Sequence, residues 1–595
     1  MADSPNTHAA GPVRLTIETG GQKLASLPVV AVTVRRAINR IPWAEIVISD
    51  GDMPTGSFAL SDAATLVPGV ALTISAGYGN DEGTIFSGIV VRHGLRIDGK
   101  ASSRLVLECR DAATRMTIGR NNANYLAQKD SDIISGLVAA HGLTASVTAT
   151  STTYDELVQF YCSDWDFMLA RADANGLLVN VDAGSVNVKP PTTSGAAVLS
   201  VGWGTELIAF EADMDARTQY TAVQAVSWDP KQQAIVEGNP ASPASLNPQG
   251  NLTGSTLAEV ASPAKYVLQT SAAQPLAGLT DWAKATQQKA ALARIRGRMS
   301  FVGSAAAVPD SLIEVKGVGA RFSGSVYVTS IEHTLGSGHW TTQVEFGLRP
   351  EWHVERDDVA APLNGGLLPG VSGLQIGVVV KLDGDPMGEQ RIQVKIPVMQ
   401  ATTPGIWARP LQFHASSGFG AFFMPEVDDE VLVGYLNGDP SSPVVLGSLY
   451  SSSRQPPYTI EAQNNTKAIV TRCLHKIEFN ENDKIITVIT PGNNQVVLDD
   501  KDQSITVLDQ HNNSAKLSSA GIALDSQSDI KLTAKGNVTI SANGAIDIAA
   551  TADLKATGMN VTCEAQAAFT GKGSASAELS AAATTTVKGA MVLIN

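Results

Sequence analysis

An apolar pair that recurs every eight residues from Ile530 onward constrains the fold more than any other feature of the chain. An apolar residue at i and another at i+2 is typical of a short strand with one buried face, and Gly536 and Gly544 stand eight apart where turns belong. A fixed short period predicts a fibre or solenoid whose units cannot bury their faces alone. The predicted core residues of this repeat are Ile530, Leu532, Val538, Ile540, Ile546, Ile548 and Leu554.

Each strand of the repeat offers only two inward side chains, which shrink to Ala, Thr and Ser near the C-terminus. One chain winding alone would bury little apolar surface, whereas three chains around one axis would share a core and leave no free sheet edge. We therefore predict a homotrimeric, triple-stranded β-helix, with a single-chain β-helix as the alternative. Four earlier apolar pairs are spaced less regularly, which predicts longer loops between them: 477/479, 496/498, 505/507 and 522/524.

The first third of the chain alternates apolar and polar residues at the period of half-buried strands, which favours a β-barrel-like domain. The predicted strands are 13–18, 44–48, 71–74 and 104–108. A helical insert follows, with Asp130 to Asp132 as a polar cap ahead of Ile133, and a second helix capped by Ser163 and Asp166 that stops at 175–176. The longest helix is predicted over 281–298, and an exposed loop over 237–263.

Residues 374–455 form a compact stretch that predicts five short strands, at 377–380, 391–396, 405–408, 430–433 and 443–446. Five short strands that close on themselves favour an OB-like barrel, with an SH3-like barrel as the alternative. The expected fold class is therefore mainly β with a helical insert.

Composition excludes several classes of function. The formal net charge of −14 argues against a nucleic-acid partner, whose phosphates are held mainly by Lys and Arg. The cysteines, Cys109, Cys162, Cys473 and Cys563, are far apart and predict reduced thiols without a zinc site. The polar N-terminus predicts no signal peptide, so synthesis in the cytoplasm is expected.

The motifs that could carry catalytic or binding chemistry are better explained as turns, caps and surface residues. The Asp-Gly-Asp sequences at 50–52 and 383–385 favour tight turns over paired catalytic carboxylates, and the Gly-x-Gly at 317–319 favours a strand-end turn. His333 and His339 flank a predicted hairpin loop, and the cations between Lys284 and Arg298 predict a solvated helix face or a trimer contact. Trp165 between two acidic residues predicts a helix cap with a buried indole. We expect no catalytic, cofactor or metal residues.

The order of these segments resembles VgrG, the spike protein of type VI secretion and related extracellular contractile injection systems, and is similar to the fused hub and needle proteins of contractile phage tails. The resemblance is carried by the segments 39–42 (Asn-Arg-Ile-Pro), 85–90, 157–176 and 420–431, and by 438–447 in the barrel. The N-terminal half looks closer to spikes of extracellular, phage-tail-like particles.

The resemblance implies a hub over 1–359, a linker over 360–373, the OB-like barrel over 374–455, a connector over 456–474 and a needle over 475–595. It implies a homotrimer that binds inner-tube and baseplate proteins, carries effector cargo and meets the target membrane only transiently. Segment 451–471 is too short for the lysozyme of some phage relatives, and the chain end leaves no fused toxin. Because the last histidine is His511, a metal-bound apex is not expected.

The resemblance therefore implies a separate tip protein of the PAAR-repeat type, for which the contact residues would be Val592, Leu593, Ile594 and Asn595. The particle that holds the spike would be secreted or released with it. Two other functions stay open at this stage: a tail-fibre-like adhesin, and an envelope glycan hydrolase built on a β-helix.

Overall fold

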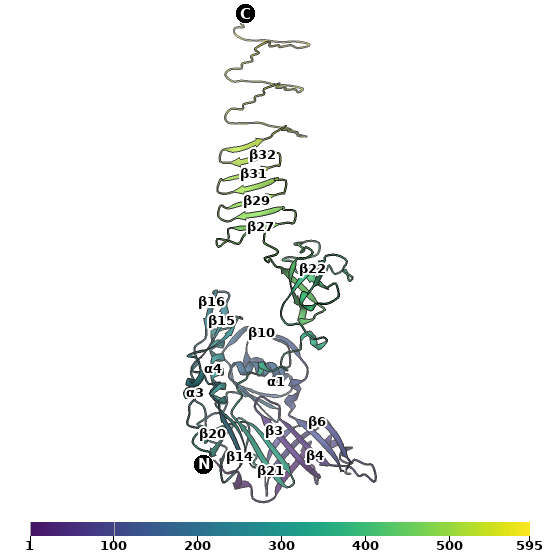
Figure 1. Cartoon of the computed structure of the whole chain (residues 1–595), viewed down its shortest axis with the longest axis vertical. Coiled ribbons are helices and arrows are strands. Elements are labelled where there is room, and N and C mark those ends of the chain that lie inside the picture. The colour runs from purple at the N-terminus through teal and green to yellow at the C-terminus, as the bar shows by residue number, and fades with distance from the viewer. Residues whose placement is uncertain (1, 100–101, 595) are drawn as a thin grey trace. The chain divides into compact units, whose positions relative to one another are not determined.

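The computed structural model describes residues 2–99 and 102–594. It divides into two compact units, Met1–Leu449 and Tyr450–Asn595, whose elements are labelled in Figure 1. Strands hold 38% of the residues and helices 12%, so the chain is mainly β, as predicted. Among the helices of the described ranges, none is both long and apolar enough to cross a bilayer. The domain boundaries within the first unit stay predictions.

A sheet of thirteen strands includes strands from both the beginning and the end of the predicted hub segment. The four strands predicted near the N-terminus are confirmed as β1, β4, β5 and β7, and β3 pairs with β20, almost 300 residues later, through Ala37 and Ser330. The hub sheet consists of β1 (Val13–Thr19), β2 (Gln22–Lys23), β3 (Val29–Ala37), β4 (Trp43–Ser49), β5 (Ala71–Tyr78), β6 (Asp81–Asp98), β7 (Ser102–Arg110), β13 (Leu199–Gly202), β14 (Leu207–Met214), β18 (Ile295–Val302), β19 (Leu312–Lys316), β20 (Gly324–Gly336) and β21 (His339–Phe346).

Two apolar cores lie along this sheet. One surrounds Ile46, Ile74 and Leu107 on the N-terminal strands, and the other surrounds Phe301 and Val344 on the later ones. The predicted turns are confirmed: Gly51, Gly384, Gly317 and Gly319 all have positive φ, and residues 336–339 join β20 to β21 as a hairpin. His333 on that hairpin is buried against Thr342, and burial lowers the pKa of its ring to about 3, so it stays neutral.

The helical insert is confirmed, with one correction. Helix α2 (Asp164–Ala174) begins at Ser163, whose hydroxyl accepts the Asp166 amide at 3.1 Å, and Trp165 is buried, as predicted. Helix α1 (Asp130–Ala140) begins without a side-chain cap, so the predicted capping role of Asp130 is wrong. The other strands of the insert are β8 (Asn121–Lys129), β9 (Thr144–Val147), β10 (Thr153–Cys162), β11 (Leu178–Asp182) and β12 (Ser185–Lys189).

The longest helix differs from its prediction at both ends. Helix α4 spans Leu276–Ala293, and residues 295–298 belong to strand β18, because Ile295 and Met299 are buried in the sheet core at strand spacing. Lys289 on α4 is buried rather than solvated, and its ammonium lies 2.7 Å from Asp173. The predicted loop 237–263 contains helix α3 (Gly254–Ala261), capped by Thr253. Strands β15 (Val223–Asp229), β16 (Ala234–Glu237) and β17 (Tyr266–Thr270) pair beside them.

The segment that leaves the hub is fastened to α2 and α4 by polar contacts. The amide of His353 donates to Asp173 and its Nε2 lies 2.9 Å from Asp166, while Lys289 donates to the Glu351 carbonyl. Arg120 donates to the carbonyls of Asp358 and Val359. These contacts fix the path of the chain before the predicted linker.

Five strands close into a barrel, as predicted: β22 (Gln375–Lys381), β23 (Ile392–Lys395), β24 (Ile406–Pro410), β25 (Glu430–Tyr435) and β26 (Pro443–Ser448). The hydrogen-bonded order is β22-β23-β24-β26-β25, and β24 and β26 run parallel. Val379, Val394 and Val431 fill its core.

The stability of the hub at low pH should depend on Asp164. Burial opposes its ionisation, but hydrogen bonds from Asn121, Gln159 and His141 outweigh this and hold the pKa of Asp164 below its usual value. Between that pKa and the unfolded value of about 3.9, the unfolded chain binds more protons. The stabilisation is therefore fully present above about pH 4 and is lost as the pH falls through the folded pKa.

We expect Asp164→Asn to reduce the loss of hub stability as the pH falls below about 4, measured by hydrogen exchange of α2 amides. The same substitution at the exposed Asp155 is the matched control. Identical acid profiles for wild type and Asp164→Asn would contradict this assignment.

Candidate functional site: an open apolar sheet face

The second unit begins with seven antiparallel strands of five residues, joined in sequence order. They are β27 (Thr466–Val470), β28 (Lys476–Asn480), β29 (Ile485–Ile489), β30 (Gln495–Asp499), β31 (Ser504–Leu508), β32 (Ser514–Ser518) and β33 (Gly521–Asp525). Their register places the second residues of one strand opposite the fourth residues of the next, so Ile477 faces Val488 and Val496 faces Val507. All of these positions share one face of the sheet.

This face is apolar and open to solvent in the single chain. Val496 is 36% exposed and Val507 47%, although each lies in the middle of the sheet, because no other part of the described chain covers them. We call this surface the needle face. Its residues are Ile477, Phe479, Ile486, Val488, Val496, Leu498, Ile505, Val507, Leu517, Ile522 and Leu524. The opposite face carries polar residues such as Glu478, Thr487, Thr506 and Lys516.

A repeat of nineteen residues, which the sequence interpretation missed, builds the sheet. Strands β28, β30 and β32 start at 476, 495 and 514, so the pairs at 477/479 and 496/498 are regularly spaced after all. Equivalent turns close each repeat, with backbone bonds from Thr471 to His475, Thr490 to Asn494 and Asp509 to Asn513. Leu474, Asn493 and Asn512 occupy the same left-handed position at φ 65°. A search for a nineteen-residue period would have found this unit, because two five-residue strands and two turns repeat together.

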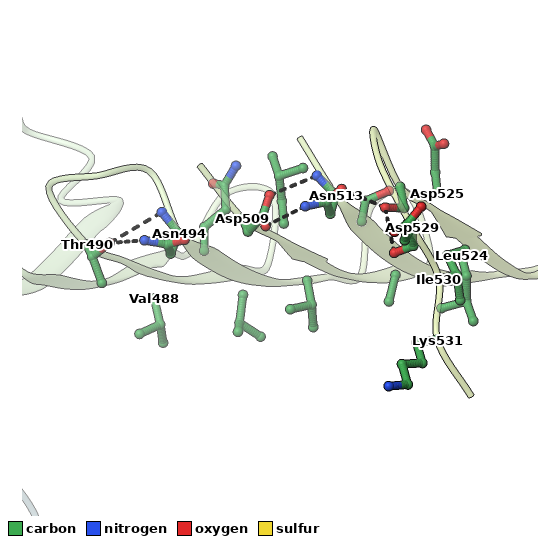
Figure 2. A pocket seen from close by; sticks show the side chains of 17 residues that line it. Val488, Thr490, Asn494, Asp509, Asn513, Leu524, Asp525, Asp529, Ile530 and Lys531 are labelled. Atoms are coloured by element: carbon green, nitrogen blue, oxygen red, sulfur yellow. Dashed lines mark hydrogen bonds between the residues drawn. The ribbon is translucent and has the colours of Figure 1, made fainter. Parts of the chain in front are cut away.

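The last turn of the sheet directs the chain into the eight-residue repeat. Asn513 Oδ1 accepts hydrogen bonds from the Ser526 hydroxyl and the Gln527 amide, and its amide group donates to Asp509. Here a groove of about 750 Å³ runs along the needle face from Val488 to Ile530. Figure 2 shows Val488 and Leu524 on one side of the ribbon and Asp525 on the other.

The predicted core residues of the eight-residue repeat stand in a chain segment that forms no helix or strand within residues 526–594. In Figure 1 this segment continues beyond β32 as wide turns without arrows. Its apolar positions are open: Ile546 is 50% exposed, Ile540 68% and Leu532 75%. The remaining predicted core residues, Ile530, Val538, Ile548 and Leu554, are exposed as well. Their burial in a shared core stays a prediction.

Of the predicted tip contacts, Val592, Leu593 and Ile594 are exposed, and Asn595 lies outside the described residues. Within the described ranges, no three His, Cys, Asp or Glu side chains gather as a metal site would require. The close carboxylate contacts of the hub and the barrel are hydrogen bonds and ion pairs within the fold, such as Asp173 with Lys289 and Asp385 with Arg391. The open needle face is therefore the candidate functional surface.

Comparison with known proteins names the family of this chain. The sequence family described as Alg8 N-terminal domain matches residues 9–337, more than half of the chain. The chain belongs to the Alg8 N-terminal domain family. A second family, described as the type VI secretion system/phage-baseplate injector OB domain, matches residues 375–450. This match decides between the two barrel predictions in favour of the OB fold.

Curated relatives of the Alg8-family chain include a toxin and a spike protein, both of the VgrG type. It is 29% identical over 163 residues to the actin cross-linking toxin VgrG1 of Vibrio cholerae serotype O1, which covers 26% of the chain and 14% of that protein. It is 30% identical over 119 residues to the type VI secretion system spike protein VgrG3 of the same species, covering 18% of the chain and 11% of that protein. The Alg8-family chain is thus similar to VgrG spike proteins over these segments, and the matches span less than a fifth of these relatives' own length.

Among solved structures, the 43 kDa tail protein of prophage MuSo2 from Shewanella oneidensis aligns with 57% of the Alg8-family chain and 98% of its own length. The identity is 12% and the TM-score 0.43.

Proposed function

We propose that the chain is one of three identical chains of a puncturing spike at the tip of a contractile injection system. The three needle faces and eight-residue repeats pack around one axis, and the N-terminal half attaches the spike to inner-tube and baseplate proteins. Contraction drives the rigid rod through a target envelope. A PAAR-type tip protein sits on the end formed by residues 592–595, and effector cargo travels with the spike.

The open needle face carries the proposal. Fully burying one apolar side chain contributes about 1.5–3 kcal/mol, so covering the exposed 40% or so of the eleven needle-face side chains contributes on the order of 10 kcal/mol per chain. A soluble monomer rarely leaves such a contiguous apolar surface in water. A second and third copy of the same face match it in length and chemistry.

The eight-residue repeat supports three copies. Three short strands make one triangular turn of about 24 residues, and sheet layers lie ~4.7 Å apart. If each turn of one chain rises by three layers, or roughly 14 Å, two of the three layers are left for strands of the two other chains. Residues 530–594 lack a strand partner within their own chain, which fits pairing between chains.

The two parts of the needle are expected to form in order. Strands β27–β33 pair with one another within one chain, so each sheet can form before assembly. The backbone groups of residues 530–594 find hydrogen-bond partners only when the three chains meet. The sheets would then set the register for the repeats above them.

Light scattering after size exclusion tests the proposal. We expect a mass of three times 62.1 kDa for the full chain, eluting early because the particle is elongated. A mass of 62.1 kDa at micromolar concentration would contradict the shared core and reopen the single-chain β-helix.

A further inference from the structure

The barrel loop between β24 and β25 displays four phenylalanines to solvent. We call residues 411–424 the phenylalanine loop. The exposed fractions are 87% for Phe413, 67% for Phe419, 78% for Phe422 and 55% for Phe423, with Leu411 beside them at 59%. The chain has 14 phenylalanines in 595 residues, so more than a quarter of them stand on this one loop.

The phenylalanine loop is a built hairpin. Ala415 bridges Gly420, the Ser416 amide donates to the Phe419 carbonyl at 3.0 Å, and the Ala421 amide donates to the His414 carbonyl at 2.9 Å. Gly420 has φ +140°, and a Cβ there would lie 2.7 Å from the His414 oxygen.

The base of the loop is closed by Gln412, whose side chain bonds both the amide and the carbonyl of Phe423. A hairpin that is already ordered loses little conformational entropy when it docks.

The phenyl rings do not stabilise the barrel that carries them. Of the loop's side chains, only Met424 packs against the barrel core. Phe419 contacts the His414 ring edge-on, at 5.7 Å between centroids. Each aromatic side chain can bury about 150–250 Å², so the four exposed rings together offer on the order of 500 Å² of apolar surface. Exposed apolar surface of this extent is typical of an interaction site.

We infer that the phenylalanine loop docks on a neighbouring copy of this chain, as a second interface of the spike at the level of the barrel. The inference rests on the proposed trimer. Residues 449–465 link strand β26 to strand β27, and a fully extended segment of that length spans at most ~60 Å. If three needle faces pack on one axis, these short links hold the three barrels near one another, at an effective concentration in the range of ~1 mM. At that concentration even a weak contact between barrels is formed most of the time.

Cysteine labelling of the full chain tests the inference. Ser417→Cys places a thiol on the phenylalanine loop and keeps all four rings, and Ser441→Cys places one at the other end of β25; both residues are exposed. The exposed Cys473 and Cys563 are replaced by Ser in each variant. We expect a maleimide to label position 417 about tenfold more slowly in the three-chain protein than in the same chain carrying Val496→Asp. A contact that is closed nine-tenths of the time protects the thiol by this factor. Position 441 should label at equal rates in both.

A further variant separates loop contact from other causes of slow labelling. Phe413→Ser with Phe422→Ser should restore fast labelling of position 417 while the mass stays that of three chains. A three-chain mass with equally fast labelling of position 417 in both backgrounds overturns the inference and leaves the loop for a partner outside the trimer. A single-chain mass overturns the proposed function itself, and the barrel contact with it.

Discussion

Val496→Asp is expected to convert the proposed three-chain assembly into single chains. Val496 lies at the centre of the needle face, between Val488 and Val507 on the neighbouring strands. In the proposed assembly, the change brings three carboxylates into a low-dielectric core, where an unpaired charge costs several kcal/mol per ion. Like charges near one axis add repulsion. Light scattering should then report 62.1 kDa in place of three times that value.

Val497→Asp is the matched control, because Val497 is the next residue and points to the opposite, polar face between Thr487 and Thr506. We expect it to keep the three-chain mass. Ile540→Asp extends the test to the eight-residue repeat and should also give single chains. If Val496→Asp and Val497→Asp leave the same mass, the needle face is not the interface.

Asp130→Ala is expected to cause the largest loss of stability within the hub. The Asp130 carboxylate is fully buried and accepts from Arg171 Nε at 2.6 Å, from Arg171 Nη2 at 2.9 Å and from the Asn175 amide at 2.7 Å. Removing it leaves the Arg171 guanidinium, which also packs over the Tyr154 ring, without its counter-charge. Breaking a buried ion pair from one side costs about 3–5 kcal/mol.

Native-state hydrogen exchange of the α1 and α2 amides measures this loss without assuming that the chain unfolds in one step. Arg217→Ala is the control, since Arg217 pairs with Asp215 on the surface at 2.7 Å and is largely exposed. We expect no measurable change there, because surface pairs contribute little. Equal protection of α2 in Asp130→Ala and wild type would show that Arg171 finds another partner.

Local pattern predicted those elements whose stability depends on near neighbours in sequence. Strand alternation located the five barrel strands to within a few residues, and the Ser163 cap located the start of α2. Where distant segments compete, local pattern failed. Residues 295–298 continue the helical composition of α4, but pairing with β14 and β21 draws them into the hub sheet. Asp130 has the position of a cap, yet Arg171, 41 residues later, takes its carboxylate.

The sequence by itself determined the eight-residue period of apolar pairs in residues 530–593, from which a shared apolar core is predicted. It also predicted a closed barrel of five short strands. Only the tertiary structure decided that residues 466–525 form a complete sheet within one chain, and that this sheet leaves a continuous apolar face uncovered. Exposure depends on which segments meet in space, and pairing over a distance has no local signature. For the same reason, only residues 420–424 of the phenylalanine loop stood out in the sequence, as part of a family motif, and only the fold showed that the four rings are exposed.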